Sequence, residues 1–312
     1  MNAISEVRSV SLGVRDLDRS LDFYRNALGY RLIERADIDA DLARWLRSPC
    51  GGEVAVIAAD DSGLGRLRLI ASDAVGEPLW NKDNLLCASG YYALNFRARD
   101  VHVLLPRIFS AGGTGPDHPS HWEVSESIAV DDSITQDPDG HRLDIFAYTR
   151  GGDLRGPLDT DVSVLQTIAL ATRDLPRSRA FYEALGFRTL FDRVLDFDEL
   201  STLLGVSGPV RIHNVNLMKD GNIVPGRVEM FAYLDVDAPE IALAPRAHPP
   251  NIGIHAMTLQ TDDVVVATHL LVAAGALPLL AMEIELPGFG ACSGAVFAGP
   301  DGETIEVVQP RR

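Results

Sequence analysis

Residues 16–31 read DLDRSLDFYRNALGYR, and residues 174–188 read DLPRSRAFYEALGFR. Both stretches contain Asp-Leu, Arg-Ser, Phe-Tyr and a final Leu-Gly-aromatic-Arg, and the second stretch lacks one residue of the first. The two copies stand in the two halves of a 312-residue chain. Such self-similarity is typical of an internal repeat, which has to be identified before any single element is assigned.

Each copy predicts a helix between two strands. Asp16 and Asp174 stand where a helix N-cap belongs, since their carboxylates can accept from exposed backbone N–H groups. Gly29 and Gly186 follow the last turn, where a left-handed residue commonly ends a helix. The apolar run before each aspartate and the aromatic residue after each glycine indicate the flanking strands.

A second strand–helix unit follows in each half. YYALNFRARDVHVLLPRIFSAGG (91–113) is similar to IHAMTLQTDDVVVATHLLVAAGA (254–276). Each half then closes with an Asp-Gly hairpin signal, DPDGHRLDIF (137–146) or GPDGETIEVV (299–308). With the strand-like runs between these segments, each half reads β-α-β-β-β twice, so we expect an α+β fold built from one unit used four times.

The chain divides near its middle. TRGGDLRGPLDTD (149–161) is rich in Gly and Asp, as expected of a linker. We therefore expect two tandem domains, residues 1–150 and 161–312, joined by residues 151–160.

Composition excludes several classes of function. The chain has 46% hydrophobic and 23% charged residues, a formal charge of −16 and no prominent basic run, so we expect no binding to nucleic acid or to membranes. Cys50, Cys87 and Cys292 are scattered without a C-x-x-C pair, which favours buried, reduced thiols over a disulfide framework or a zinc site. The first residues lack a signal-peptide pattern, and we expect a cytoplasmic protein.

The motif D-L-x-R-S-x-x-F-Y-x-x-x-L-G-[YF], with a closing P-D-G-x-x-[ILV]-[DE], resembles the vicinal oxygen chelate superfamily. This group includes glyoxalase I, methylmalonyl-CoA epimerase, the extradiol dioxygenases and the bleomycin-resistance proteins. The resemblance implies that paired βαβββ modules form a curved mixed sheet around a cup, one cup in each domain. In many members the cup holds a divalent metal. The tandem arrangement is compatible with a monomer or a homodimer.

The resemblance also implies four ligand positions in each half, on the first and last strands of the two modules. In the N-terminal half they fall on Ser9, Arg68, Ala93 and Asp144. This set does not suit a metal, because a cation beside an empty position repels one. We expect a metal-free N-terminal domain with an ion pair between Arg68 and Asp144.

In the C-terminal half, Glu229 and Glu306 fall on ligand positions. Thr167 takes the first position, with Gln166 beside it. Two carboxylates that converge in a cup repel one another unless a cation or a proton lies between them. We expect Glu229 and Glu306 to meet in one cup and to be the catalytic pair.

The fourth C-terminal position is open between two residues. A regular strand brings Ala256 to the cup, whereas a bulge would bring in His255 and complete a set with Glu229 and Glu306. Such a set could accept Mn²⁺, Fe²⁺ or Zn²⁺. The alternative for His255 is a half-buried histidine that points away from the cup.

Further histidines are weaker candidates. His213 lies in the middle of an expected strand and is a candidate substrate-binding residue, with a surface or core role as the alternative. His118, His121 and Trp122 lie in an expected loop that could form a lid or rim over the first cup.

The leading functional hypothesis is a glyoxalase-like enzyme with non-redox proton-transfer, isomerase or lyase chemistry on a small oxygenated molecule, aromatic or not, and without a nucleotide cofactor. The first alternative is a metal-free small-molecule binding or drug-sequestering protein. The second is an extradiol ring-cleaving dioxygenase. It ranks last because Phe297 and Thr167 replace a tyrosine and a histidine of the signature that the resemblance implies.

Overall fold

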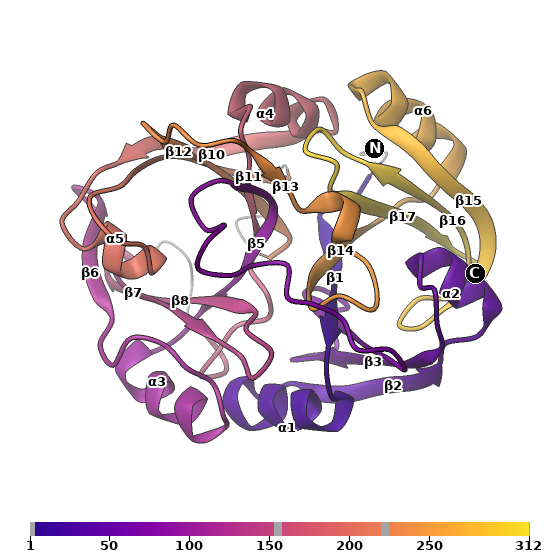
Figure 1. Ribbon diagram of the computed structural model, residues 1–312, viewed down its shortest axis with the longest axis horizontal. Coiled ribbons are helices and arrows are strands. Elements are labelled where there is room, and N and C mark those ends of the chain that lie inside the picture. The colour runs from indigo at the N-terminus through magenta and orange to yellow at the C-terminus, as the bar shows by residue number, and fades with distance from the viewer. Residues whose placement is uncertain (1–3, 153–157, 220–224, 312) are drawn as a thin grey trace.

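The computed structural model describes residues 4–152, 158–219 and 225–311. The chain has an α+β fold with two strongly curved mixed sheets and few helices (Figure 1). Among the described residues, no helix has the length and apolar character needed to span a bilayer. Residues 153–157 of the expected linker lie outside the described residues.

The four predicted units are confirmed, each as a strand, a helix and three further strands. The first unit is β1 (Val7–Val14), α1 (Leu17–Leu28), β2 (Arg31–Asp37), β3 (Gly52–Ala58) and β4 (Arg66–Ser72), with a short helix α2 (Ala40–Leu46) inserted after β2. The second is β5 (Ala88–Arg97), α3 (Val101–Ser110), β6 (Ser120–Ser125), β7 (Ile128–Gln136) and β8 (Arg142–Arg150).

The third unit is β9 (Thr167–Ala171), α4 (Leu175–Ala184), β10 (Phe187–Leu195), β11 (Arg211–Lys219) and β12 (Arg227–Leu234), with a short helix α5 (Leu200–Leu204) after β10. The fourth is β14 (Gly253–Gln260), α6 (Val264–Ala274), β15 (Leu277–Leu286), β16 (Gly290–Ala298) and β17 (Thr304–Pro310). A two-residue strand, β13 (Ile241–Ala242), and a 3₁₀ turn, Ala244–Arg246, connect them.

The predicted helix ends are confirmed. Asp16 accepts from the backbone N–H of Arg19 at 3.0 Å, and Asp174 accepts from that of Arg177 at 3.1 Å. Gly29 has a φ of 75°, which only glycine adopts at little cost. The motif therefore encodes both ends of α1.

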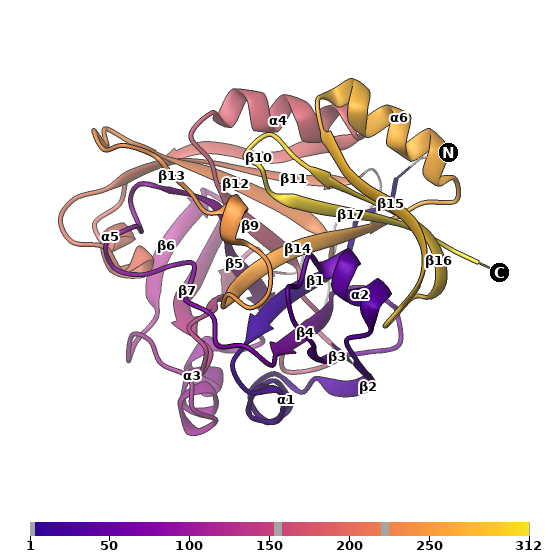
Figure 2. The same cartoon turned by 45° about the vertical axis from the view of Figure 1, so that its right-hand side comes forward.

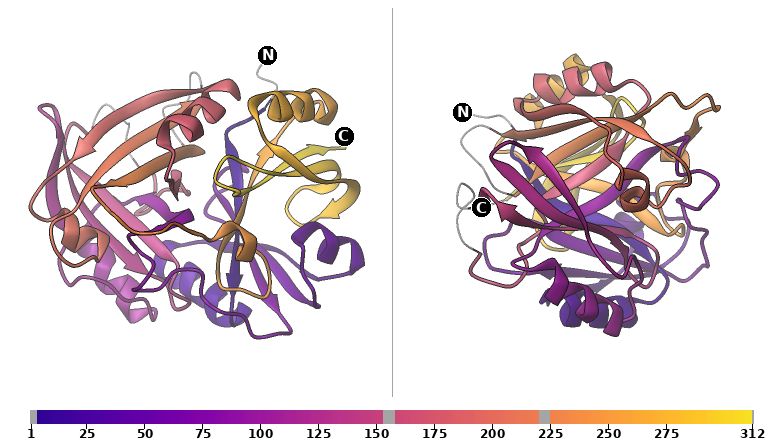
Figure 3. Two further views of the ribbon diagram at one scale, coloured as in Figure 1. Left: turned by 45° about the horizontal axis from the view of Figure 1, so that its top comes forward. Right: turned by 90° about the vertical axis from the view of Figure 1, so that its left-hand side faces the viewer.

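Each sheet combines one unit from each half of the sequence. In the described part of the chain, the eight-stranded sheet has the order β15-β16-β17-β14-β1-β4-β3-β2 and contains the first and fourth units. The nine-stranded sheet runs β10-β11-β12-β9-β5-β8-β7-β6, with β13 added beside β5, and contains the second and third units. Figure 3 shows the two sheets side by side. The expectation that the two units of one sequence half would share a cup is therefore wrong.

Units from different halves share a sheet because of the strand pair at the centre of each sheet, which we call its seam. β1 pairs antiparallel with β14, and β5 pairs antiparallel with β9. Backbone hydrogen bonding along such edges carries little sequence information, so the sequence does not show which first strand pairs with which.

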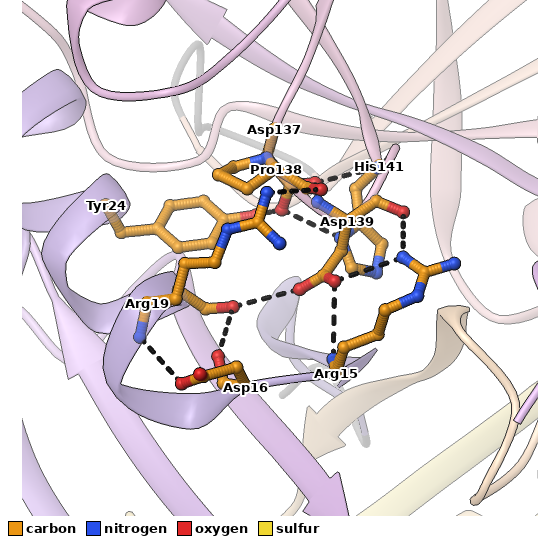
Figure 4. A network of polar contacts seen from close by, with 9 residues as sticks. Arg15, Asp16, Arg19, Tyr24, Asp137, Pro138, Asp139 and His141 are labelled. Carbon is orange, nitrogen blue, oxygen red and sulfur yellow. Dashed lines mark hydrogen bonds and ion pairs between the residues drawn. The ribbon is translucent and has the colours of Figure 1, made fainter. Parts of the chain in front are cut away.

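Contacts outside the sheets join the two units of each half. α1 packs against α3 on one outer side of the molecule, and α4 packs against α6 on the opposite side (Figure 2). The Asp-Gly hairpin of the second unit also contacts α1. Asp139 accepts from the Ser20 hydroxyl at 3.0 Å, and Asp137 accepts from the Tyr24 hydroxyl at 2.9 Å and contacts His141 Nδ1 at 2.8 Å (Figure 4).

The second half repeats this connection. Asp301 accepts from the Ser178 hydroxyl at 2.6 Å, and Glu303 accepts from the Tyr182 hydroxyl at 2.7 Å. The Ser and Tyr shared by both copies of the motif thus anchor the closing hairpin of the neighbouring unit. Their role in this chain is structural.

The three cysteines are free. Cys292 is buried, as expected, whereas Cys50 and Cys87 are half-buried.

Candidate functional site

The cup of the eight-stranded sheet is filled by side chains of the protein, and we call it the filled cup. Helix α2 lies over it and inserts Trp45, whose side chain is fully buried. Trp45 belongs to an apolar cluster that also includes Leu42, Leu46, Val54, Ile70, Leu286, Val296 and Val308. The indole ring lies so close to Gly294 that a Cβ atom there would be 2.5 Å from it.

Glu306 lies in the filled cup, where neighbouring groups satisfy its carboxylate. Arg68 Nη1 donates to both carboxylate oxygens at 3.0 and 2.9 Å. Trp45 Nε1 donates at 2.7 Å and the Thr258 hydroxyl at 2.6 Å. The predicted Arg68–Asp144 ion pair is wrong, because the first unit shares its sheet with the fourth. Glu306 is a structural residue here and does not meet Glu229.

His255 lies on β14 at an irregularity of the strand. Ser11 pairs with Ala256 and Leu12 with Ile254, so His255 is the extra residue of a bulge. Its side chain nevertheless contacts the backbone carbonyl of Asn251 through Nε2 at 2.8 Å. Ala256 is buried in the same sheet. The predicted Glu229–His255–Glu306 metal set is therefore wrong, since Glu229 belongs to the other sheet.

Burial lowers the pKa of His255 to about 3 from its ordinary value of 6.5, against the smaller opposing effect of the Asn251 carbonyl. Between these two values the unfolded chain binds a proton that the folded chain does not, so stability falls as the pH falls below 6.5. From pH 7 to pH 5 the free energy of unfolding should fall in both proteins. We expect the fall to be about 2 kcal/mol smaller in His255→Gln than in the parent protein. Urea unfolding at pH 5, 6 and 7 measures this difference.

The matched control for this prediction is His269→Gln, because His269 is exposed on α6. This variant should follow the parent protein at every pH. An identical pH dependence for His255→Gln and the parent would show that His255 can be protonated in the folded state.

The cup of the nine-stranded sheet is open, and we call it the open cup. It encloses a cavity of about 410 Å³, within the range usual for small-molecule sites. Its lining includes aliphatic and aromatic side chains, which we call its walls, among them Trp122, Val130, Phe146, Tyr148, Phe197, Leu200, Leu203 and Ile212. A second group of lining residues is polar, and we call it the floor: Asn95, Asp132, Asp144, Thr167, Asn214, Asn216, Arg227 and Glu229.

Trp122 and Phe197 form one wall of the open cup. Their rings stack with centroids 5.4 Å apart and planes 8° from parallel. The segment with Trp122 is strand β6 and not the expected loop, and it borders the cup of the second and third units. His121 contacts Asp131 at 2.8 Å and is exposed.

Glu229 lies on the floor of the open cup within a set of asparagine side chains. Asn214 Nδ2 donates to one carboxylate oxygen at 2.6 Å. Asn95 Nδ2 and Asn216 Nδ2 donate to the other at 2.9 and 3.4 Å. Burial raises the pKa of Glu229, and the bond from Asn214 opposes this rise. We call these four residues the amide clamp.

Asp132 and Asp144 form a carboxyl pair beside the amide clamp. Burial raises the pKa of both groups, and the neighbouring charge and hydrogen bond of Asp132 raise the pKa of Asp144 further. Trp122 Nε1 donates to Asp132 Oδ2 at 3.1 Å. Among the described residues, no N–H or O–H group donates to the Oδ1 atom of either aspartate. A proton held between the two carboxyl groups, or a donor on a bound molecule, would satisfy these atoms.

The other predicted residues of the C-terminal half divide between the cup and its surroundings. Thr167 lines the open cup near Glu229, as expected. Gln166 is buried outside the lining, with Nε2 3.4 Å from the Val164 carbonyl. His213 contacts Asp192 at 2.7 Å on the outer face of β11, because its neighbours Ile212 and Asn214 point inward.

Sequence reasoning missed Asn95, Asp132, Asn214, Asn216 and Arg227. A signal existed for part of this set, since Asn214, Asn216, Arg227 and Glu229 occupy alternate positions on two paired strands. Asn95 pairs with both Thr167 and Asp144, so it takes the position that we expected for Ala93.

The family resemblance implies a divalent metal at the positions now held by Asn95, Asp144, Thr167 and Glu229. These side chains provide no imidazole or thiolate ligand. Three amide N–H groups already point at Glu229, and the guanidinium of Arg227 lines the same floor. Within the described ranges, no three His, Cys, Asp or Glu residues are arranged to hold a metal ion. Fe²⁺ and Zn²⁺ would lack the nitrogen or sulfur ligands that they prefer, and the amide N–H groups and the guanidinium oppose any divalent ion, including Mn²⁺.

Comparison with protein-family models supports the resemblance. The model of the glyoxalase/bleomycin resistance protein/dioxygenase superfamily matches residues 6–145 and again residues 164–307. A comparison with curated proteins gives no match.

Solved structures show the same fold at low sequence identity. Glyoxalase I from Zea mays is 19% identical, with a TM-score of 0.64 over 98% of this chain and 92% of that chain. A putative dioxygenase from Bacillus subtilis subsp. subtilis str. 168 is 12% identical, with a TM-score of 0.59 over 100% of this chain and 87% of that one. At these identities the likeness shows the fold alone.

Proposed function

Because the chain belongs to the glyoxalase/bleomycin resistance protein/dioxygenase superfamily, we propose that its open cup binds a small oxygenated organic molecule and moves a proton on it, in isomerase or lyase chemistry without a redox step. The observation that supports this proposal is the Asp132–Asp144 pair at the floor of a cavity with apolar walls.

Asp144 is the proposed proton-transfer group. A carboxyl group whose pKa is raised above its ordinary value can take up a proton from a carbon or oxygen acid and return it. Asp132 is the second member of the pair and accepts a hydrogen bond from Trp122 Nε1. Arg227 lines the same floor, where its positive charge would stabilise an oxyanion formed next to the site of deprotonation. Glu306, our first candidate, has no part in this chemistry.

Proton exchange in D₂O tests the proposal. Small aldehydes, ketones and hydroxyketones, aliphatic and aromatic, are first screened for a rise in melting temperature. Each compound that binds is then followed by proton NMR for exchange of the C–H beside its carbonyl group. We expect exchange with at least one compound, and we expect Asp144→Asn to slow it about 100-fold without loss of the thermal shift.

Asp131→Asn is the matched control, because Asp131 lies on the same strand as Asp132 but contacts His102 and His121 instead of the cup. This variant should exchange at the parent rate. Equal exchange rates for Asp144→Asn and the parent protein would refute the assigned role.

Binding without turnover is the second candidate function. The Trp122–Phe197 stack and the aliphatic residues of α5 provide an apolar wall against which a ring can pack. Compounds that raise the melting temperature and are recovered unaltered, with no exchange, would establish this alternative.

A further inference from the structure

The open cup has a surplus of hydrogen-bond acceptors on its floor. Among the described residues, five buried oxygen atoms of the lining lack a hydrogen-bond partner: Asn95 Oδ1, Asp132 Oδ1, Asp144 Oδ1, Thr167 Oγ1 and Asn216 Oδ1. The side chains of Asn95, Asp132 and Thr167 are more than nine-tenths buried. Unpaired buried polar atoms are costly, so a bound molecule that supplies donors would be favoured.

The amide clamp sets the orientation of two of these acceptors. Asn95 and Asn216 direct their N–H groups toward Glu229, so their carbonyl oxygens face away from it. Rotation of either amide by 180° would bring an oxygen against the carboxylate and is disfavoured. Glu229 thereby acts as a positioning residue, because its negative charge turns neighbouring carbonyl oxygens away from itself.

The charge of the floor favours a cation. Three carboxyl groups, of Asp132, Asp144 and Glu229, face one guanidinium, of Arg227. The sum is negative whether or not one proton is shared within the aspartate pair. Asp192 and Arg193 at the rim have partners of their own, His213 and the Val124 carbonyl respectively.

We propose that the open cup recognises a primary ammonium group on an aromatic or apolar body, with the ammonium at the position that a metal takes elsewhere in the family. An ammonium ion brings three N–H donors that these oxygen atoms can accept, and it brings one positive charge, whereas a divalent ion would set twice that charge against the guanidinium of Arg227. The stack of Trp122 and Phe197 receives the apolar body. This inference rests on the proposed use of the open cup.

Calorimetric titration at pH 7 with four matched probes tests this inference: 2-phenylethylamine, its N,N,N-trimethyl derivative, 2-phenylethanol and phenylacetate. We expect the primary amine to bind at least about tenfold more tightly than each of the others. The trimethyl derivative keeps the charge but lacks N–H donors, so it separates hydrogen bonding from simple charge attraction. Equal binding of the trimethyl derivative and the primary amine, or tighter binding of phenylacetate, would overturn the inference.

Two variants identify the acceptors. Thr167→Val removes a hydroxyl, and Asp132→Asn replaces an acceptor with a donor. Each variant should bind 2-phenylethylamine about tenfold more weakly than the parent protein. Thr189→Val is the control, since the Thr189 hydroxyl donates to Glu183 outside the cup. Mn²⁺ is titrated in parallel. Displacement of the amine by Mn²⁺ would show that the floor is a metal site after all.

The outcomes distinguish this inference from the proposed function. Binding of the amine without proton exchange on any compound would support recognition of an ammonium group and refute the proposed enzymatic activity. Exchange on a compound without an amine, together with no binding of 2-phenylethylamine, would retain the enzyme and refute the ligand class.

Discussion

Replacing Arg68 with methionine should lower the free energy of unfolding by about 3–5 kcal/mol. Arg68 is fully buried and donates to both oxygens of Glu306, which is itself buried. Methionine fills much of the same volume but leaves a buried carboxylate without its counter-ion. Urea unfolding followed by circular dichroism measures the loss.

A double variant separates the charge effect from packing. In Arg68→Met with Glu306→Gln, the amide oxygen still accepts from Trp45 and neither member of the pair is charged, so much of the loss in unfolding free energy should be recovered. Arg25→Met is the surface control, because Arg25 and Asp22 form an exposed pair that contributes at most about 1 kcal/mol. A loss below that value for Arg68→Met would mean that the pair does not stabilise the filled cup.

Replacing Trp45 with alanine should cost about 3–5 kcal/mol as well. The indole ring fills the cup between α2 and the sheet and also donates to Glu306. Its removal leaves a cavity that the surrounding strands cannot close, because their backbone pairing holds them apart. Added indole should bind in that cavity and raise the melting temperature of the variant but not that of the parent protein.

Two further tryptophan variants serve as controls. Trp45→Phe keeps most of the ring and should lose less stability than Trp45→Ala. Trp122→Ala alters the wall of the open cup, where the ring is only half-buried, so it should weaken ligand binding more than it weakens folding. Equal stability of Trp45→Ala and the parent would show that the filled cup is not a packed core.

Local sequence patterns predicted the units of this fold well. Asp16, Gly29 and the apolar positions between them specify a helix through short-range hydrogen bonds and side-chain burial. The family resemblance placed Glu229 and Thr167 on inward-facing strand positions, which alternation allows. It also indicated Asp144, although with the wrong partner.

Other features depend on contacts that are distant in the sequence. The position of α2 over one cup decides that this cup is filled, and nothing within residues 40–46 shows which sheet they cover. The sequence pattern allowed a bulge at His255. The direction of the His255 side chain, however, depends on its hydrogen bond with the carbonyl of Asn251, a contact that the strand pattern does not show. The amide clamp joins β5, β11 and β12, so it exists only after the sheet has formed.

The sequence by itself determined that one unit occurs four times and that an aspartate begins the long helix of each copy. Only the tertiary structure decided that the first unit pairs with the fourth and the second with the third, which separates Glu306 from Glu229 and places Asp144 beside Glu229. The physical reason is that partner choice depends on contacts between units distant in the sequence, such as the buried pair of Arg68 and Glu306, and not on the pattern within one unit.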